Sequence, residues 1–188
     1  MAPELCYGRR RLSPRPSGAQ PFAVVVAIAT ASALSAAPAR AFERQWHLGV
    51  AAVGVAPTEP RPTGFGFGAY AAYGVSDMFD VRMELRSSFH AESKKSERFA
   101  LHLGSAGLAY KLDVLEWIPS FGVRAGYYEQ TAAEPGAARR GAALGGFAGL
   151  DHAFSRSFAA GVEVSVDRLL PEGGTSALAL RAEYRFGY

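Results

Sequence analysis

The clearest feature of the chain is an alternation of apolar and polar residues with a period of two. The segment at residues 175–188 shows it best. One set of alternating positions is apolar, namely Leu178, Leu180, Ala182, Tyr184, Phe186 and Tyr188. The positions between them are charged or small, namely Ala177, Ala179, Arg181, Glu183, Arg185 and Gly187. Because successive side chains of a β-strand point to opposite faces, this pattern predicts a strand with one apolar and one charged face.

The same alternation recurs along the chain, and turn-forming residues separate the segments. It predicts eight strands, at residues 45–55, 64–75, 79–89, 98–111, 119–130, 142–154, 158–169 and 175–188. Short connections at 76–78 and 155–157 alternate with longer, more polar ones, and 113–118 is of middle length. Long and short connections at opposite ends are typical of an antiparallel up-and-down meander. The fold class is therefore all-β, an eight-stranded antiparallel barrel.

The segment at residues 98–111 departs from the pattern, because its apolar positions change phase. Those before the change are Phe99, Leu101 and Leu103, and those after it are Ala106, Leu108 and Tyr110. One extra residue in the strand would bring both sets to the same face. We therefore expect a β-bulge near Gly104 and Ser105.

The first 41 residues have the pattern of a secretory signal peptide. Four arginines between residues 9 and 15 precede an apolar, Ala-rich run at residues 22–37, and Ala39 and Ala41 provide small residues at a cleavage site. We expect cleavage after Ala41, which leaves residues 42–188 as the mature barrel. An uncleaved membrane anchor is the alternative, but the run is short and rich in Ala, Ser and Thr.

Removal of the leader changes the charge and the cysteine content. Residues 1–41 hold five Arg and one Glu, so 15 Lys and Arg and 16 Asp and Glu of the chain's 20 and 17 remain. The positive charge of the whole chain therefore gives no reason to expect nucleic acid as a partner. Cys6 is the sole cysteine and leaves with the leader, so the mature chain has no disulfide.

Alternation alone does not tell which face lies inside, and a secreted soluble barrel would have its apolar face inward. Export favours the opposite arrangement, in which lipid meets the apolar face. The charges of the polar face are nearly balanced, which suits an enclosed lumen where each charge needs a partner. This expected lumen network contains five basic and six acidic residues: Arg82, Arg86, Arg124, Arg181, Arg185, Asp80, Glu84, Asp151, Glu163, Asp167 and Glu183.

Aromatic residues gather at the strand ends, as the two interfaces of a membrane select. The belt at the short connections contains Trp46, Tyr73, Phe79, Tyr110, Trp117, Phe121, Phe154 and Phe158, with Phe186 and Tyr188 beside them. At the long connections we expect Phe65, Phe89, Phe99 and Tyr127. Phe79 and Phe89 are ten residues apart, which at about 3.3 Å per residue and a ~40° tilt spans roughly 25 Å, the height of the apolar band.

The segments at 73–85 and 110–127 each look like a strand-turn-strand unit of a known family. In these segments, and in its overall pattern, the region 43–188 resembles the small eight-stranded outer-membrane barrels of the OmpA and OmpX type. The resemblance implies a transmembrane barrel in the outer membrane of a Gram-negative-type bacterium, without the peptidoglycan-binding domain of many relatives. It also implies that the barrel-assembly machinery reads a C-terminal signal formed by Leu180, Tyr184, Phe186 and Tyr188.

The candidate chemistry of the mature chain is sparse. The histidines are His47, His90, His102 and His152, and none is followed two residues later by a serine, the His-x-Ser arrangement that would place both side chains of a lipid-hydrolysing pair on one face of a strand. No close His and carboxylate cluster suggests a metal. We therefore expect neither an enzyme nor a cofactor. Basic residues beyond the outer belt could attract lipopolysaccharide phosphates, although acidic neighbours offset them: Lys94, Lys95, Arg98, Arg139 and Arg140.

The expected function is that of a monomeric outer-membrane barrel with a structural or surface role, in contact with outer-membrane lipid and lipopolysaccharide. Its lumen would be filled by salt bridges, because an eight-stranded barrel is just wide enough for side chains. Two alternatives stay open. One is a small pore gated by an arginine that changes partners, and the other is a secreted soluble barrel that binds an apolar ligand.

Overall fold

The computed structural model describes residues 44–58, 62–91, 98–112, 116–132, 138–171 and 173–187. The expected leader, with its cleavage after Ala41, lies outside the described residues. So do Lys94, Lys95 and the last residue, Tyr188.

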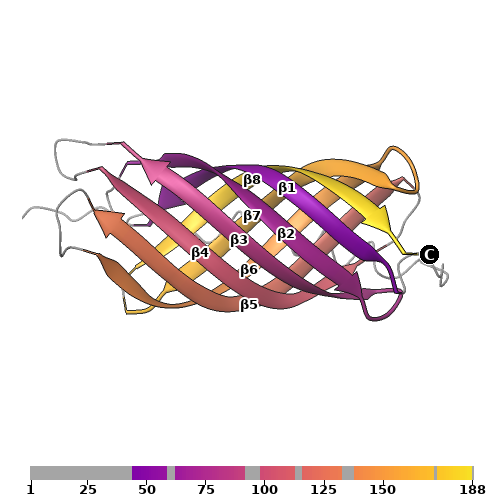
Figure 1. Cartoon of the computed structure of the whole chain (residues 1–188), viewed down its shortest axis with the longest axis horizontal. Coiled ribbons are helices and arrows are strands. Elements are labelled where there is room, and N and C mark those ends of the chain that lie inside the picture. The colour runs from indigo at the N-terminus through magenta and orange to yellow at the C-terminus, as the bar shows by residue number, and fades with distance from the viewer. Residues whose placement is uncertain are drawn as a thin grey trace, which may run out of the picture. The chain divides into compact units, whose positions relative to one another are not determined.

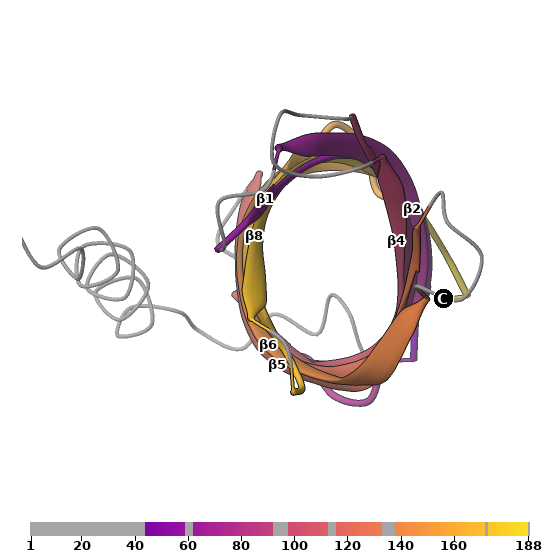
Figure 2. The same ribbon diagram turned by 90° about the vertical axis from the view of Figure 1, so that its left-hand side faces the viewer.

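Eight strands close into a barrel in which each strand pairs antiparallel with the next, and β8 pairs with β1 (Figures 1 and 2). They are β1 (Trp46–Pro57), β2 (Gly64–Gly74), β3 (Phe79–His90), β4 (Phe99–Lys111), β5 (Trp117–Ala132), β6 (Arg139–Ala153), β7 (Phe158–Leu169) and β8 (Gly174–Phe186). The predicted all-β, eight-stranded antiparallel barrel is thus confirmed. No helix in the described ranges is long and apolar enough to cross a membrane.

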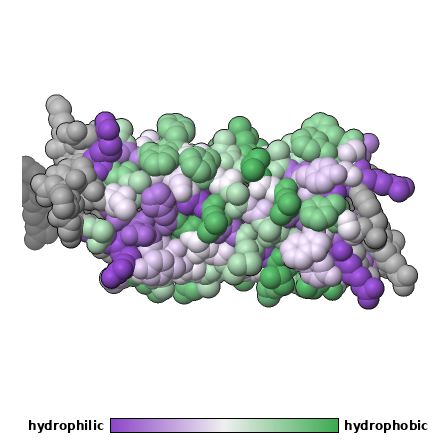
Figure 3. Space-filling view, viewed as in Figure 1, coloured by the Kyte–Doolittle hydropathy of each residue, from purple (hydrophilic) through white to green (hydrophobic). Residues whose placement is uncertain are grey.

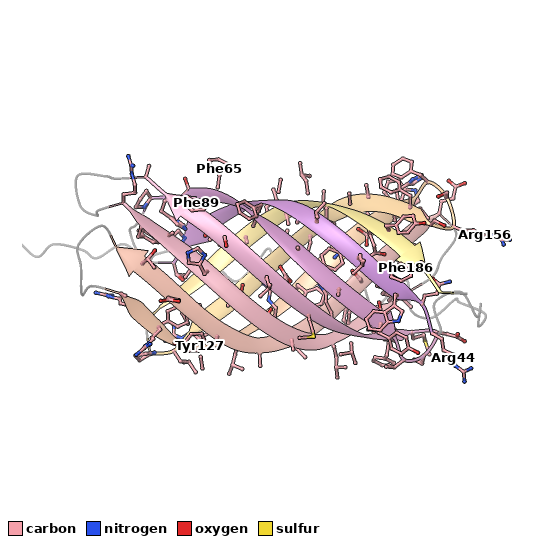
Figure 4. The ribbon with its side chains drawn as sticks, in the orientation of Figure 1. Arg44, Phe65, Phe89, Tyr127, Arg156 and Phe186 are labelled. Carbon is pink, nitrogen blue, oxygen red and sulfur yellow. The ribbon has the colours of Figure 1, made fainter. Side chains whose placement is uncertain are left out.

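Two tight turns lie at one end of the barrel, and in each a serine hydroxyl accepts a hydrogen bond from a backbone amide of the same turn. In the turn between β2 and β3, the Ser76 hydroxyl accepts a hydrogen bond from the Phe79 amide at 3.1 Å. In the turn between β6 and β7, Ser155 accepts one from the Phe158 amide, also at 3.1 Å. Such side-chain bonds favour turns over extended structure. We call this end the short-turn end, and the opposite end, where Phe65, Phe89 and Tyr127 lie, the long-loop end (Figure 4).

The two faces of the sheet differ sharply in chemistry. On β3, Met83 and Leu85 leave 64% and 71% of their surface exposed on the outside, whereas Asp80, which points inward, leaves 1% exposed. Apolar residues cover much of the outer surface in the space-filling view (Figure 3). A barrel with its polar residues inside and its aliphatic residues outside has the arrangement that lipid, and not water, requires around it.

The predicted β-bulge near Gly104 and Ser105 is wrong, because strand β4 has none. The pairing of β4 with β3 and with β5 runs without a break from Phe99 to Lys111. Phe99, Leu101 and Leu103 therefore point into the barrel, and Phe99 does not belong to the outer belt. Apolar side chains can face either way in this half of the barrel, since the interior there is itself apolar. They pack in a buried cluster that consists of Phe99, Leu101, Leu103, Tyr128, Ala143 and Leu169.

The continuous pairing of β4 can be tested with spin labels attached to single cysteines in the mature barrel, which has none of its own. Labels at Ala100 and Leu108 should collide readily with oxygen dissolved in the bilayer, because both side chains lie on the outer face. A label at Leu101 or Leu103 should be shielded. High oxygen accessibility at Leu101 and Leu103 would show that a bulge does turn them toward lipid.

Candidate functional site: the charged interior

The interior of the barrel holds twelve buried charged side chains among the described residues, apart from histidine. Six are acidic: Asp80, Glu84, Asp151, Glu163, Asp167 and Glu183. Six are basic: Arg82, Arg86, Lys111, Arg124, Arg181 and Arg185. The structure thus brings together all eleven charged residues singled out from the sequence, and adds Lys111. The numbers of positive and negative groups are then equal, as an enclosed set of charges requires.

Near the short-turn end, the charges gather around Glu183 on β8. The Arg185 Nε lies 2.7 Å from Glu183 Oε1, and His47 Nδ1 lies 2.9 Å from the same oxygen. The Tyr70 hydroxyl donates a hydrogen bond to the other oxygen, Oε2, at 2.9 Å. Nearby, Lys111 Nζ and Asp80 Oδ2 form an ion pair at 2.6 Å.

At mid-height, Glu163 on β7 lies between two arginines. Its Oε2 is 2.5 Å from Arg82 Nη1 and 2.5 Å from Arg181 Nη1. Arg181 also donates to both carboxylate oxygens of Asp151, including a 2.7 Å bond from Nε to Oδ1. The guanidinium of Arg82 lies 4.1 Å above the centre of the Tyr70 ring, a favourable position for a cation.

Nearer the long-loop end, Arg124 on β5 makes a bidentate contact with a carboxylate. Its Nε and Nη2 donate to the two oxygens of Asp167 at 2.9 and 2.7 Å, the parallel arrangement that arginine and carboxylate favour. Its Nη1 donates to Glu84 at 2.8 Å. Arg86 lies 3.3 Å from Asp167 and 3.5 Å from Glu84, so two arginines and two carboxylates form a closed group.

Glu84 joins this group to the mid-height layer, because its carboxylate also lies 3.2 Å from Arg82. A single network of ion pairs therefore crosses the lumen from β3 to β5, β7 and β8. Each charge that leaves its partners would lie in a narrow, mostly protein-lined space, at a cost of several kcal/mol. Such an arrangement holds the strands at fixed positions around the barrel and leaves little freedom for any one arginine to swing.

Glycines make room for the network where they are paired with one of its residues on the neighbouring strand. A Cβ on Gly49 would lie 2.1 Å from the Tyr70 ring, and a Cβ on Gly145 would lie 2.0 Å from Asp167 Oδ1. Any larger residue at these two places would displace Tyr70 from Glu183, or Asp167 from Arg124. The small residues of β1 and β6 thus serve the packing of the interior.

Toward the long-loop end the interior becomes apolar. The cluster around Phe99 faces this region from one side, and a second cluster of Val53, Val55, Ala177 and Ala179 lines β1 and β8. The buried ring of His90 stacks on Phe99 with centres 4.2 Å apart, and its Nδ1 lies 3.0 Å from the carbonyl oxygen of Pro62. The lumen is therefore charged in its middle and at its short-turn end, and it is lined by apolar groups toward its long-loop end.

Three interior residues that the sequence analysis did not assign to the network are His47, Tyr70 and Lys111. The assumed bulge in β4 obscured the direction of Lys111, which an unbroken alternation from Phe99 places inward. His47 lies in β1, where glycine and alanine weaken the alternation. The proximity of Tyr70 to Glu183 joins β2 to β8, a contact between strands that sequence patterns do not give.

The other residues chosen from the sequence lie on the outer face. The aromatic belt gathers at the short-turn end, where rings touch in pairs such as Trp46 with Tyr73 and Phe79 with Tyr110. His152 lies between the rings of Trp117 and Phe154. Of the expected C-terminal signal, three residues, Leu180, Tyr184 and Phe186, are exposed along β8. Arg98, Arg139 and Arg140 are exposed at the long-loop end.

Comparisons with known proteins identify the fold. No protein-family model matches the chain, and no curated protein matches it in sequence. Among solved structures, it resembles Neisserial surface protein A (TM-score 0.60, 14% identity, 77% of this chain and 96% of that one). It also resembles OprG from Pseudomonas aeruginosa (TM-score 0.61, 10% identity, 78% of this chain and 98% of that one). A third similar structure is Ail from Yersinia pestis (TM-score 0.51, 17% identity, 77% of this chain and 100% of that one). The chain has the fold of the small eight-stranded outer-membrane barrels, which confirms the resemblance seen in its sequence.

The mid-height layer gives a test of the network. Glu163→Gln should lower the free energy of unfolding by about 3 kcal/mol, because Arg82 and Arg181 would then face each other without the shared carboxylate. Urea titration in phospholipid vesicles, followed by fluorescence of Trp46 and Trp117, measures this. Glu116→Gln is the matched control, since that side chain is 78% exposed and should change stability by less than about 0.5 kcal/mol. Equal stability of the two variants would argue against a stabilising network.

Proposed function

We propose that the mature chain is an integral outer-membrane β-barrel with a structural and surface role, and that it acts as a monomer. The observation that carries this proposal is the inversion of the barrel: charged groups are buried inside while Met83, Leu85 and their neighbours are exposed. Burial of these aliphatic side chains in lipid stabilises the protein by about 25 cal/mol per Å², a gain that water cannot give. The ring of aromatic residues at the short-turn end supports the same placement, since such rings favour the membrane interface.

In this placement the short-turn end faces the periplasm and the long-loop end faces outward, as is usual for barrels of this kind. The exposed arginines at the long-loop end, Arg98, Arg139 and Arg140, then lie at the height of lipopolysaccharide phosphates. One of the proteins of like fold is named as a surface protein and another as an attachment invasion locus protein. These names favour a role at the cell surface. The barrel-assembly machinery would insert the chain with the help of Leu180, Tyr184 and Phe186.

Membrane insertion is tested by migration on gels. The mature protein, refolded in detergent or vesicles, should migrate differently before and after boiling, because a closed barrel resists unfolding by the gel detergent.

Deletion of the gene should raise the sensitivity of the outer membrane to bile salts or polymyxin. A mature protein that folds in water without detergent, with Arg82 and Glu163 accessible to reagents, would instead favour the soluble barrel.

The proposal includes no transport and no catalysis inside the lumen. Arg82, Arg124 and Arg181 each contact at least two carboxylates, so opening a path would require several buried pairs to part together. We expect planar bilayers that contain the purified protein to show no discrete conductance steps at any voltage. A matched recording on Glu163→Gln tests whether a weakened network opens the lumen. Steps in the unmodified protein would favour the gated pore.

A further inference from the structure

The lipid-facing surface has a polar interruption at the long-loop end. On the outer face of four neighbouring strands, Ser87 (β3), His102 (β4), Glu129 (β5) and Arg140 (β6) form one row across the sheet. The pairing of the strands places Ser87 opposite His102, His102 opposite Glu129, and Glu129 opposite Arg140. Hydrophilic side chains are visible near this end of the barrel, at the left of Figure 3. The row is unusual because the outer positions nearer the middle of these strands are apolar or small.

Within the row, Ser87 and His102 are already in contact. The Ser87 Oγ lies 2.9 Å from His102 Nδ1, and both side chains are partly buried. A serine hydroxyl at hydrogen-bonding distance from an imidazole is the arrangement that activates serine as a nucleophile. Glu129 stands on the far side of His102 from Ser87. Directly paired positions of antiparallel strands bring Cβ atoms to about 4.5–5.5 Å, so a glutamate can reach the ring.

The depth of the pair in the membrane gives the substrate class. Along the outer face of β3, Ser87 lies between Leu85, which belongs to the aliphatic band, and Phe89 at the long-loop end. On β5, Glu129 is the next outward residue beyond Tyr127. The row therefore begins at the edge of the hydrocarbon and rises toward the headgroups. The ester bonds that join acyl chains to lipid headgroups lie at this boundary, where water is also present.

We propose that Ser87, His102 and Glu129 form a site on the outside of the barrel that hydrolyses acyl esters of the surrounding outer-leaflet lipid. His102 takes the proton of the Ser87 hydroxyl while Oγ forms a bond with the ester carbonyl carbon. The bond from that carbon to the headgroup oxygen breaks, and the leaving oxygen takes the proton from His102. Water, deprotonated by His102, then releases the acyl chain as a fatty acid and restores Ser87. Glu129, at the paired position beside His102, is placed to stabilise the positive charge of the imidazole.

This activity goes beyond the structural role proposed above and relies on it for the position of the barrel in the membrane. It also departs from the expectation that the chain is not an enzyme. That expectation considered a histidine followed two residues later by a serine on one strand. Here the two residues belong to neighbouring strands and are 15 positions apart in sequence. Strand pairing, which the sequence does not show directly, brings them together.

A fluorophosphonate probe tests the nucleophile without knowledge of the natural lipid. The mature barrel in phospholipid vesicles should gain the phosphonyl group on Ser87, detected by mass spectrometry of the peptide. His102→Ala should reduce the labelling rate at least tenfold. Ser176 is the internal control, because it is also exposed at the long-loop end but bonds to the carbonyl oxygen of Ala56 and not to a histidine. Equal labelling of Ser87 and Ser176, or none at Ser87, would overturn the proposal.

Turnover is tested in vesicles of diacyl phospholipid with added lipopolysaccharide. Free fatty acid should appear with the unmodified protein, fall at least 100-fold in Ser87→Ala and His102→Ala, and fall less in Glu129→Gln. Vesicles made of ether-linked lipid should give no product. Each variant must keep the migration of the folded barrel on unboiled gels, so that loss of activity is not loss of fold. If folded protein gives no fatty acid, the hydrolase is disproved while the membrane barrel stands.

Discussion

The structure depends on the need to pair charges that a closed sheet encloses. An eight-stranded barrel leaves an interior filled by side chains, so a carboxylate or guanidinium there meets protein more than water. Glu163 and Glu84 each form ion pairs with more than one arginine. Their strands, β7 and β3, lie on different sides of the lumen, so these contacts connect walls that backbone hydrogen bonds do not join directly. Closure of the sheet and neutralisation of its interior therefore support each other.

The outer surface follows from the same alternation. Once the charged residues of a strand point inward, its other residues must point outward, and the chain places Val, Leu, Met and Phe there. Such a surface is favourable in lipid, and a belt of aromatic rings borders it at the short-turn end. The serine turns between β2 and β3 and between β6 and β7 keep this alternation in register, since a turn of fixed length fixes which residues are opposite. Local hydrogen bonds at Ser76 and Ser155 thus help to decide which side chains meet lipid.

Much of the fold could be predicted from the sequence because a period of two is a direct consequence of strand geometry. The eight strands lie within a few residues of their predicted ends, and the eleven charged residues assigned to the lumen are all buried. The prediction fails in β4, where it took every large apolar residue to be lipid-facing. Phe99, Leu101 and Leu103 pack inward against Tyr128 and Leu169, which alternation cannot reveal when both faces are apolar. Contacts between strands, such as Tyr70 with Glu183, need the pairing order and the tilt of the barrel.

A fixed interior also limits where such a protein can act. The middle of the lumen is held by ion pairs and its long-loop end is lined by apolar clusters, so the surfaces left to meet other molecules are the ends of the barrel and its lipid-facing wall. Polar residues on that wall are costly in hydrocarbon, and the cost decreases toward the interface. The row from Ser87 to Arg140 lies where the cost is small and where lipid esters and water coexist. Its position is therefore compatible with a stable barrel, and it places a hydroxyl, an imidazole and a carboxylate side by side on three neighbouring strands.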